Sequence, residues 1–197
     1  PSVDPNDVDG SESDDRGSRI FAAPYEPGST IKTLSFAAMF DAGVTTPSDQ
    51  VIAPRSYPTT GSYRIGDAWD HGDLRLTSAG VLMNSSNTGT AVLSERLSLQ
   101  QRYDYLTRFG LGESTGVGFL GEAGGSVRDP DSIDGHSAVT QMFGQGMTAT
   151  SAQVASAYQA IANGGVHTPL TLVTGCDRAD GSTTHARKRR AWSRHRW

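Results

Sequence analysis

The sequence predicts an α+β fold in which helices predominate and the strand signals lie at the margins. Two observations support this fold class. Apolar residues recur at helical spacing in residues 29–43 and again in residues 150–164, each time up to a glycine that can end a helix. β-Branched and apolar residues gather instead in "VHTPLTLVTG", residues 166–175, as is typical of a strand.

The first third of the chain contains one clear helix. Residues 1–24 are acidic, and we expect them to be an extended lead-in. In "YEPG", Pro27 restricts φ and Gly28 permits an unusual backbone, which predicts a turn just before a helix. The helix should begin at Ser29 and end at Gly43, because a helical stripe runs through Ile31, Leu34, Ala38 and Ala42.

The middle of the chain mixes loops and helices. The Pro-, Gly- and Thr-rich residues 45–73 include "GSYRIGDAWDHG", which predicts a hairpin or an ordered loop. We expect a helix in "LRLTSAGVLMN", residues 74–84, interrupted by the turn formers "SSNTG". Residues 90–110 predict one or two further helices ending at Gly110.

The last part of the chain contains the strongest helix signal. After an irregular Gly-rich stretch at 111–135, Thr150 and Gln153 have the spacing of a capping box. An apolar stripe follows them, and Gly164 closes the helix. The strand predicted at residues 166–175 contains Pro169, which indicates either an edge strand or a position near the start of the strand.

Composition indicates a loop-rich globular chain that can bury a sizeable core. Of the 197 residues, 36% are hydrophobic and 19% charged, with 23 glycines, 9 prolines and a mean hydropathy of −0.42. No apolar run approaches the roughly 18 residues that a membrane span needs. The single Cys176 excludes an intrachain disulfide framework and offers no metal cluster, so we expect no metal and no cofactor.

Charge is distributed unevenly along the chain. The net charge is −4, but residues 185–197, "HARKRRAWSRHRW", carry six Arg or Lys and no carboxylate. Such a tail could bind nucleic acid, or it could be a disordered or non-native terminus. Composition favours the second interpretation, and we expect no nucleic-acid partner.

The lysines point to a reactive site. The sequence contains 17 Lys plus Arg, but only Lys32 and Lys188 are lysines. Ser29 and Lys32 are three residues apart, so they lie on the same face of a helix. A buried lysine can lose its proton and act as a base for a serine, whereas arginine stays protonated. The alternative is that Ser29 caps the helix while Lys32 extends to solvent.

A second polar motif follows about fifty residues later. Ser85 and Asn87 form a Ser-x-Asn pattern in a turn between two predicted helices. There a hydroxyl and an amide could face a cleft, or the motif could be an ordinary polar turn. Neither motif is specific by itself.

Together with their surroundings, these motifs resemble a known family. "YEPGSTIK", "SSNTG", "FGLGESTGVGF" and "FGQGMTATSAQVASAYQAIANGG" occur in the order found in the transpeptidase domain of class B penicillin-binding proteins, of the β-lactamase/transpeptidase-like superfamily. The similarity runs from "VDPND" to "LVTG". It implies an acidic lead-in at 1–24, a partial transpeptidase domain at 25–175 and a divergent basic tail at 176–197.

The resemblance also implies roles for the motif residues. Ser29 would be the acyl-accepting nucleophile and Lys32 its general base. Ser85 would relay protons to or from the leaving group, and Asn87 would bind the peptide carbonyl of the substrate. The implied ligands are peptidoglycan stem peptides ending in D-Ala-D-Ala and β-lactam antibiotics, with other cell-wall synthesis or division proteins as further partners. The parent protein would hold this domain on the extracytoplasmic side of the cell membrane.

The family's third motif, Lys-Thr/Ser-Gly on a strand beside the cleft, does not occur in this sequence. "VTG" at 173–175 comes too early and lacks the lysine. We therefore expect the chain to be truncated and frameshifted near its C-terminus, without its membrane anchor or its C-terminal sheet. This expectation makes the chain inactive by itself and leaves Phe36, Met39 and Phe40 partly exposed.

Two alternatives to a transpeptidase remain, one a hydrolytic enzyme and the other a non-catalytic protein. A β-lactamase or D,D-carboxypeptidase of the same fold would use water as the acceptor, although no deacylating Glu stands in a recognisable loop. A non-catalytic β-lactam-binding sensor module would keep the fold without turnover. The sequence does not distinguish a role in division from one in elongation.

Overall fold

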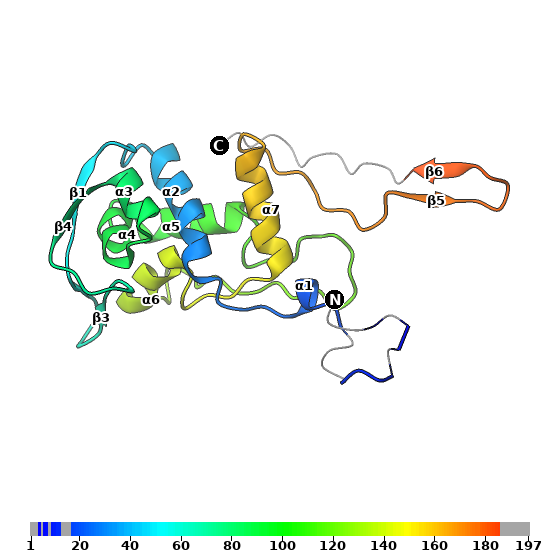
Figure 1. The fold of residues 1–197 in the computed structure, drawn as a ribbon, viewed down its shortest axis with the longest axis horizontal. Helices are drawn as coiled ribbons and strands as arrows, with labels where there is room; N and C mark the ends of the chain where they lie inside the picture. The colour runs from blue at the N-terminus through cyan, green and yellow to red at the C-terminus, as the bar shows by residue number, and fades with distance from the viewer. Residues whose placement is uncertain (1–3, 5, 8, 13–16, 186–197) are drawn as a thin grey trace.

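The computed structural model describes residues 4, 6–7, 9–12 and 17–185 (Figure 1). The elements follow in the order α1 (Arg19–Ala22), η2 (Gly28–Thr30), α2 (Ile31–Asp41), β1 (Gln50–Ala53), β2 (Tyr57–Pro58), β3 (Arg64–Ile65), β4 (Leu74–Thr77), α3 (Ser78–Met83), α4 (Asn87–Ser94), α5 (Leu99–Arg108), α6 (Gly135–Thr140), η3 (Gln141–Phe143), α7 (Ser151–Ala162), β5 (Gly175–Asp177) and β6 (Thr183–His185). Helices predominate and the strands are short, so the predicted α+β class is confirmed.

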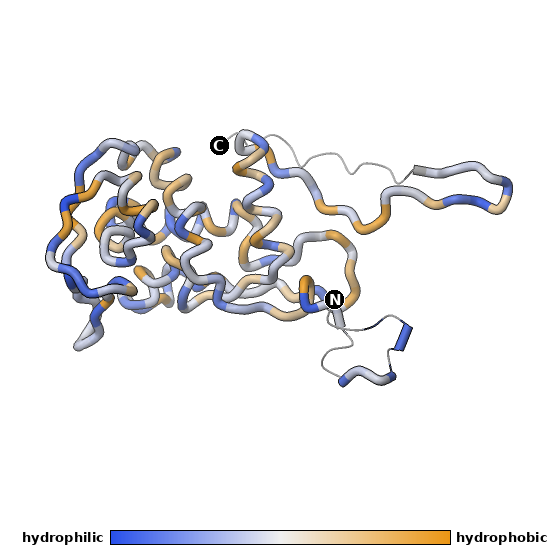
Figure 2. The backbone as a smooth tube through the Cα atoms, viewed as in Figure 1, coloured by the Kyte–Doolittle hydropathy of each residue, from blue (hydrophilic) through white to orange (hydrophobic). Residues whose placement is uncertain are grey.

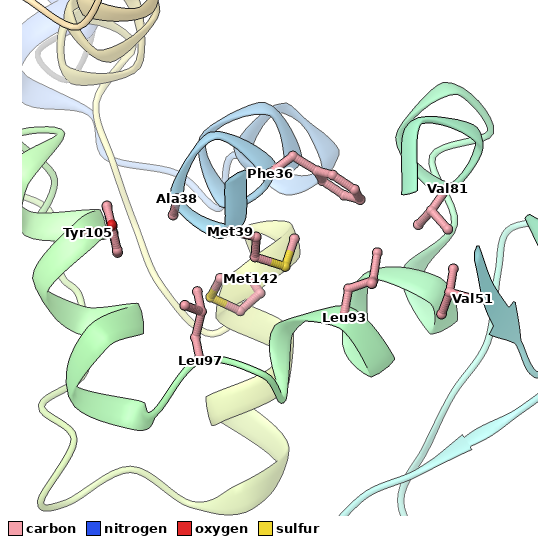
Figure 3. Close-up of a cluster of buried hydrophobic side chains, with 9 residues drawn as sticks. All are labelled: Phe36, Ala38, Met39, Val51, Val81, Leu93, Leu97, Tyr105 and Met142. Carbon is pink, nitrogen blue, oxygen red and sulfur yellow. The ribbon is translucent and has the colours of Figure 1, made fainter. Parts of the chain in front are cut away.

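Helix α2 lies at the centre of the molecule and contacts α4, α5, α7 and η3. One of its sides packs into the cluster drawn in Figure 3: Phe36, Ala38, Met39, Val51, Val81, Leu93, Leu97, Tyr105 and Met142. Its other side, with Ile31 and Leu34, packs against residues from α5 and α7. A helix that is apolar nearly all round is buried on several sides, and the hydropathy colouring shows α2 as mostly apolar (Figure 2).

This packing corrects the expectation that α2 would expose its apolar residues. Phe36 and Met39 are 1% and 0% exposed, and Phe40 is partly buried against the same cluster. The helices around α2 cover the residues for which the sequence analysis expected a missing sheet. Each square ångström of apolar surface removed from water contributes about 25 cal/mol of stabilisation, and the fully buried Ile31 and Leu34 of the second cluster bring such stabilisation to the first turn of α2.

The segment 74–84, predicted as one helix, is a strand followed by a helix. Residues of β4 pair antiparallel with β1, and Leu76 faces Val51 across the pair. Leu74 and Leu76 alternate with exposed residues, which is the two-residue period of a strand. Thr77 then caps α3 by accepting a hydrogen bond from the backbone N–H of Gly80. The helix prediction was wrong for residues 74–77, whose side chains alternate as in a strand, and the helix begins only at Ser78.

Several other predictions are confirmed. A small hairpin pairs β2 with β3, so the predicted stretch "GSYRIGDAWDHG" contains the second strand of this hairpin and continues as a loop. The predicted residues 90–110 contain the end of α4 and all of α5, and Gly110 comes two residues after α5 with a φ of 82°. Helix α7 begins with the predicted capping box between Thr150 and Gln153.

The strand predicted at 166–175 is not formed. Residues 166–174 contain no strand, and Leu172 and Val173 are each 53% exposed. A strand needs a neighbour for its backbone hydrogen bonds, and no described strand pairs with residues 166–174. The chain forms β5 only at Gly175–Asp177, in a hairpin with β6 that projects away from the helices (Figure 1).

The predicted lead-in and tail are described only in part. Residues 1–24 include one helical turn, α1, rather than extended chain throughout. Phe21, from this turn, stacks on Phe119 with ring centroids 4.9 Å apart. The tail prediction for 176–197 overlaps the β5–β6 hairpin, and residues 186–197 lie outside the described part of the chain. Among the described residues, no helix has the length and apolarity to cross a membrane, and no group of His, Cys, Asp and Glu could hold a metal ion.

Candidate active site

Ser29 lies in the short turn η2, directly ahead of α2, and its side chain faces solvent. The predicted special backbone is present, because Gly28 has a φ of 58°. The turn is held from two sides. Gly28 N–H donates to the carbonyl of Gly144 (2.9 Å), and the Tyr158 hydroxyl donates to the carbonyl of Thr30 (2.8 Å).

The contact between Gly28 and Gly144 requires glycine at position 144. Gly144 has a φ of 80°, and a Cβ there would lie 2.2 Å from the Gly28 carbonyl oxygen. No side chain fits at that separation without a backbone shift. The turn carrying Ser29 therefore packs directly against the backbone at Gly144, which follows η3.

Lys32 is in the first turn of α2 and is only 1% exposed. Its Nζ donates to the Ser85 Oγ (3.0 Å), to the Asn87 Oδ1 (2.6 Å) and to the Ser85 carbonyl. An ammonium has three N–H donors, so all three are used, and none of the three goes to Ser29. The alternative in which Lys32 extends to solvent is excluded by this burial.

The environment of Lys32 makes its proton easier to lose than that of an ordinary lysine. Burial lowers the pKa of Lys32 to about 8, against the opposing attraction of the Asp67 carboxylate. At pH 7 about one Lys32 in ten is then neutral, compared with fewer than about one in a thousand for an ordinary lysine. Such a lysine can accept a proton near neutral pH.

Ser85 occupies a strained position between α3 and α4. The backbone N–H of Ser86 donates to the Val81 carbonyl and that of Ser85 to the Leu82 carbonyl, both at 3.0 Å, which is the Schellman pattern that ends a helix. Ser85 takes the left-handed position, with a φ of 53°, where glycine is usual. Among the described residues it is the one non-glycine with a positive φ. This backbone directs both the carbonyl and the hydroxyl of Ser85 at Lys32.

Asn87 is the first residue of α4, and its amide is largely occupied. Its Oδ1 accepts from Lys32 and its Nδ2 donates to the Gly66 carbonyl (3.0 Å). One N–H of the amide remains for another acceptor. The structure thus brings Lys32, Ser85 and Asn87 into direct contact, with Ser29 one helical turn from Lys32.

Sequence analysis missed Asp67. Its side chain is fully buried, and its Oδ1 accepts from the backbone N–H groups of Asn87 (2.6 Å) and Thr88 (2.9 Å). Burial alone would raise the pKa of Asp67, but hydrogen bonds from Ser86, Thr88, Asn87 and His71 outweigh it and hold the pKa below its usual range. The spacing of twenty residues between Asp67 and Asn87 has no helical or strand period, so no sequence signal connects them.

With this geometry in hand, comparison with known proteins identifies the family. A family model described as the penicillin binding protein transpeptidase domain matches residues 1–194. This chain belongs to the penicillin-binding protein transpeptidase domain family.

Curated relatives of this transpeptidase domain are longer proteins. Penicillin-binding protein PbpB of Mycobacterium tuberculosis is 37% identical over 182 residues, which are 92% of this chain and 27% of PbpB. The peptidoglycan D,D-transpeptidase FtsI of Escherichia coli is 31% identical over 172 residues, 87% of this chain and 29% of FtsI. The transpeptidase domain described here thus spans less than a third of either relative.

Solved structures share its fold. Penicillin binding protein 3 from Mycobacterium tuberculosis complexed with ampicillin superposes with a TM-score of 0.82 at 37% identity, covering 87% of this chain and 38% of that one. The aztreonam complex gives 0.83 at 36% identity, covering 95% and 41%. A peptidoglycan synthetase from Bifidobacterium adolescentis gives 0.82 at 30% identity, covering 90% and 33%. The predicted β-lactamase/transpeptidase-like fold, mainly its helical part, is confirmed.

Proposed function

We propose that this transpeptidase domain supplies the nucleophile and proton-transfer groups of a peptidoglycan D,D-transpeptidase that also binds penicillin. The observation that carries the proposal is the buried Lys32, which hydrogen-bonds Ser85 and Asn87 one turn after an exposed Ser29. Family membership and relatives named as D,D-transpeptidases add support.

In the first half of the proposed reaction, the Ser29 Oγ attacks the carbonyl carbon of the penultimate D-Ala of a stem peptide. Lys32 takes the hydroxyl proton as the new C–O bond forms. The C–N bond to the terminal D-Ala then breaks, and Ser85 passes a proton from Lys32 to the leaving nitrogen. The 3.0 Å separation of Lys32 Nζ and Ser85 Oγ suits this transfer.

In the second half, an amine on another peptide strand attacks the acyl-enzyme. It loses a proton along the same route in reverse and releases Ser29. The free N–H of Asn87 would donate to a peptide carbonyl of the substrate. A β-lactam carbonyl would react with Ser29 as the D-Ala-D-Ala carbonyl does. The domain would work on the extracytoplasmic side of the membrane, beside cell-wall division or elongation proteins.

A fluorescent penicillin tests this proposal on a longer version of the domain that includes a Lys-Thr/Ser-Gly strand. All variants carry Cys176→Ser, because Cys176 is exposed and a thiol can also be acylated. We expect a labelled band on a denaturing gel that disappears in Ser29→Ala. Labelling that survives Ser29→Ala would contradict the assignment of the nucleophile. Supplying an amine acceptor and measuring transfer distinguishes a transpeptidase from an enzyme that uses water.

A further inference from the structure

A pair of buried groups behind the Ser85–Asn87 turn has no part in the mechanism above. Asp67 and His71 lie in the loop between β3 and β4, and their side chains are 0% and 6% exposed. His71 Nε2 is 3.0 Å from Asp67 Oδ2, and His71 Nδ1 is 2.5 Å from the Gly72 carbonyl oxygen. Both ring nitrogens therefore face acceptors, and both are satisfied only when the imidazole carries two protons.

Asp67 connects this histidine to the candidate active site. One carboxylate oxygen faces His71, and the other accepts from the first two backbone N–H groups of α4, those of Asn87 and Thr88. A negative charge at that end of the helix is favoured by the unpaired N–H groups there. Asn87 in turn holds the Nζ of Lys32. The contacts form one chain from His71 through Asp67 and Asn87 to Lys32.

We propose that Asp67 and His71 form a positioning pair, in which Asp67 fixes the turn that holds Lys32 and His71 limits how strongly the Asp67 charge retains the lysine proton. The proposal rests on the proposed function of Lys32 as a base. A carboxylate near Lys32 favours the ammonium form, while a hydrogen bond from the His71 imidazole to the far oxygen of that carboxylate weakens the effect.

The charged groups around His71 agree with this arrangement. Asp67 and Asp70 both act on the imidazole, and Asp70 is itself paired with Arg55 (2.9 Å) at the surface. The Gly72 carbonyl raises the pKa of His71, burial opposes it, and the Asp67 carboxylate raises it further. On the other side, Asp67 raises the pKa of Lys32 and thereby opposes part of the effect of burial. The pair thus acts on the proton affinity of Lys32 through charge as well as through position.

The chain offers a direct measurement, because its only other lysine is Lys188. In a Lys188→Arg background of the 197-residue chain, lysine labelled with ¹³C at Cε gives a single NMR signal, that of Lys32. Its titration midpoint needs no acyl transfer, so failure of the proposed reaction would leave this test intact. The variants are Asp67→Asn, His71→Ala, their combination, and Asp70→Asn as a control in the same loop.

The proposal predicts opposite signs for the two members of the pair. Asp67→Asn should lower the Lys32 midpoint by about one unit, the lower end of the effect of a nearby opposite charge. His71→Ala should raise it, and the double variant should match Asp67→Asn, because His71 acts through Asp67. Asp70→Asn should leave the midpoint within about 0.2 unit, since this exposed carboxylate is screened by solvent.

A purely structural role predicts something different. Loosening the site would expose Lys32 and raise its midpoint in all three variants that touch the pair. A rise in Asp67→Asn, or no change, therefore overturns the proposal. If the Lys32 midpoint of the double variant matches that of His71→Ala instead of that of Asp67→Asn, His71 does not act through Asp67, and the proposal is overturned as well.

Discussion

The left-handed backbone of Ser85 predicts an unusual response to glycine. An L-residue in this conformation costs about 1–2 kcal/mol, whereas glycine adopts it readily but loses about 0.5–1 kcal/mol of chain entropy on folding. Ser85→Ala and Ser85→Gly both remove the hydroxyl that lies 3.0 Å from Lys32 Nζ, and both keep the backbone carbonyl. The difference in unfolding free energy between the two variants therefore measures the backbone strain at position 85.

We expect Ser85→Gly to be more stable than Ser85→Ala by about 1 kcal/mol, which is about 2–4 °C in Tm for a chain of this size. Thermal and urea unfolding measure the difference. Ser151, the exposed first residue of α7, provides the control, because there Gly should be less stable than Ala. If Ser85→Ala equals or exceeds Ser85→Gly in stability, Ser85 is not strained and the reasoning about the turn fails.

Three further predictions concern the reactive groups. Lys32→Arg should reduce acylation of Ser29 in the longer domain by at least about 10²-fold, because the charge stays but the removable proton is lost; stopped-flow acylation rates measure this. Gly144→Ala should slow the same acylation, because its Cβ would meet the Gly28 carbonyl, whereas Gly164→Ala, which has the same sign of φ but open space, should keep the rate. The 197-residue chain, whose sequence contains no Lys-Thr/Ser-Gly motif, should form no stable penicillin adduct, because the family resemblance assigns one oxyanion-hole N–H to the strand with that motif and loss of one such donor costs about 10²–10³ in rate. A Ser29-dependent band of full intensity on a denaturing gel would contradict that last prediction.

The parts of the fold that depend on local chemistry were predictable. Thr150 and Gln153 form the capping box that their spacing predicts, and Gly28 adopts the positive φ that a turn before a helix requires. In both cases the signal lies within a few residues of the feature. The sequence left two positions open for Lys32, buried or extended to solvent, and the structure buries it at 1% exposure.

The parts that depend on distant neighbours were not predictable. Residues 166–174 have the composition of a strand, but a strand also needs a partner, and none of the described segments supplies one. Asp67 lies in a loop of turn formers, and its contact with α4 arises only when β1 and β4 bring that loop back to the helix. The positive φ of Ser85 was not predictable either, because a serine in the sequence does not indicate a left-handed backbone.

The central claim is that Lys32 activates Ser29 by accepting its proton. The pH dependence of Ser29 acylation by a β-lactam, measured by mass spectrometry in the longer domain with Cys176→Ser, tests it most directly. Because the pKa of Lys32 is lowered to about 8, the protonated form predominates below that pH and the base is the neutral form. The rate should rise about tenfold per pH unit up to pH 7 and level off above about pH 8. A rate that is flat between about pH 6 and 9 would contradict the claim.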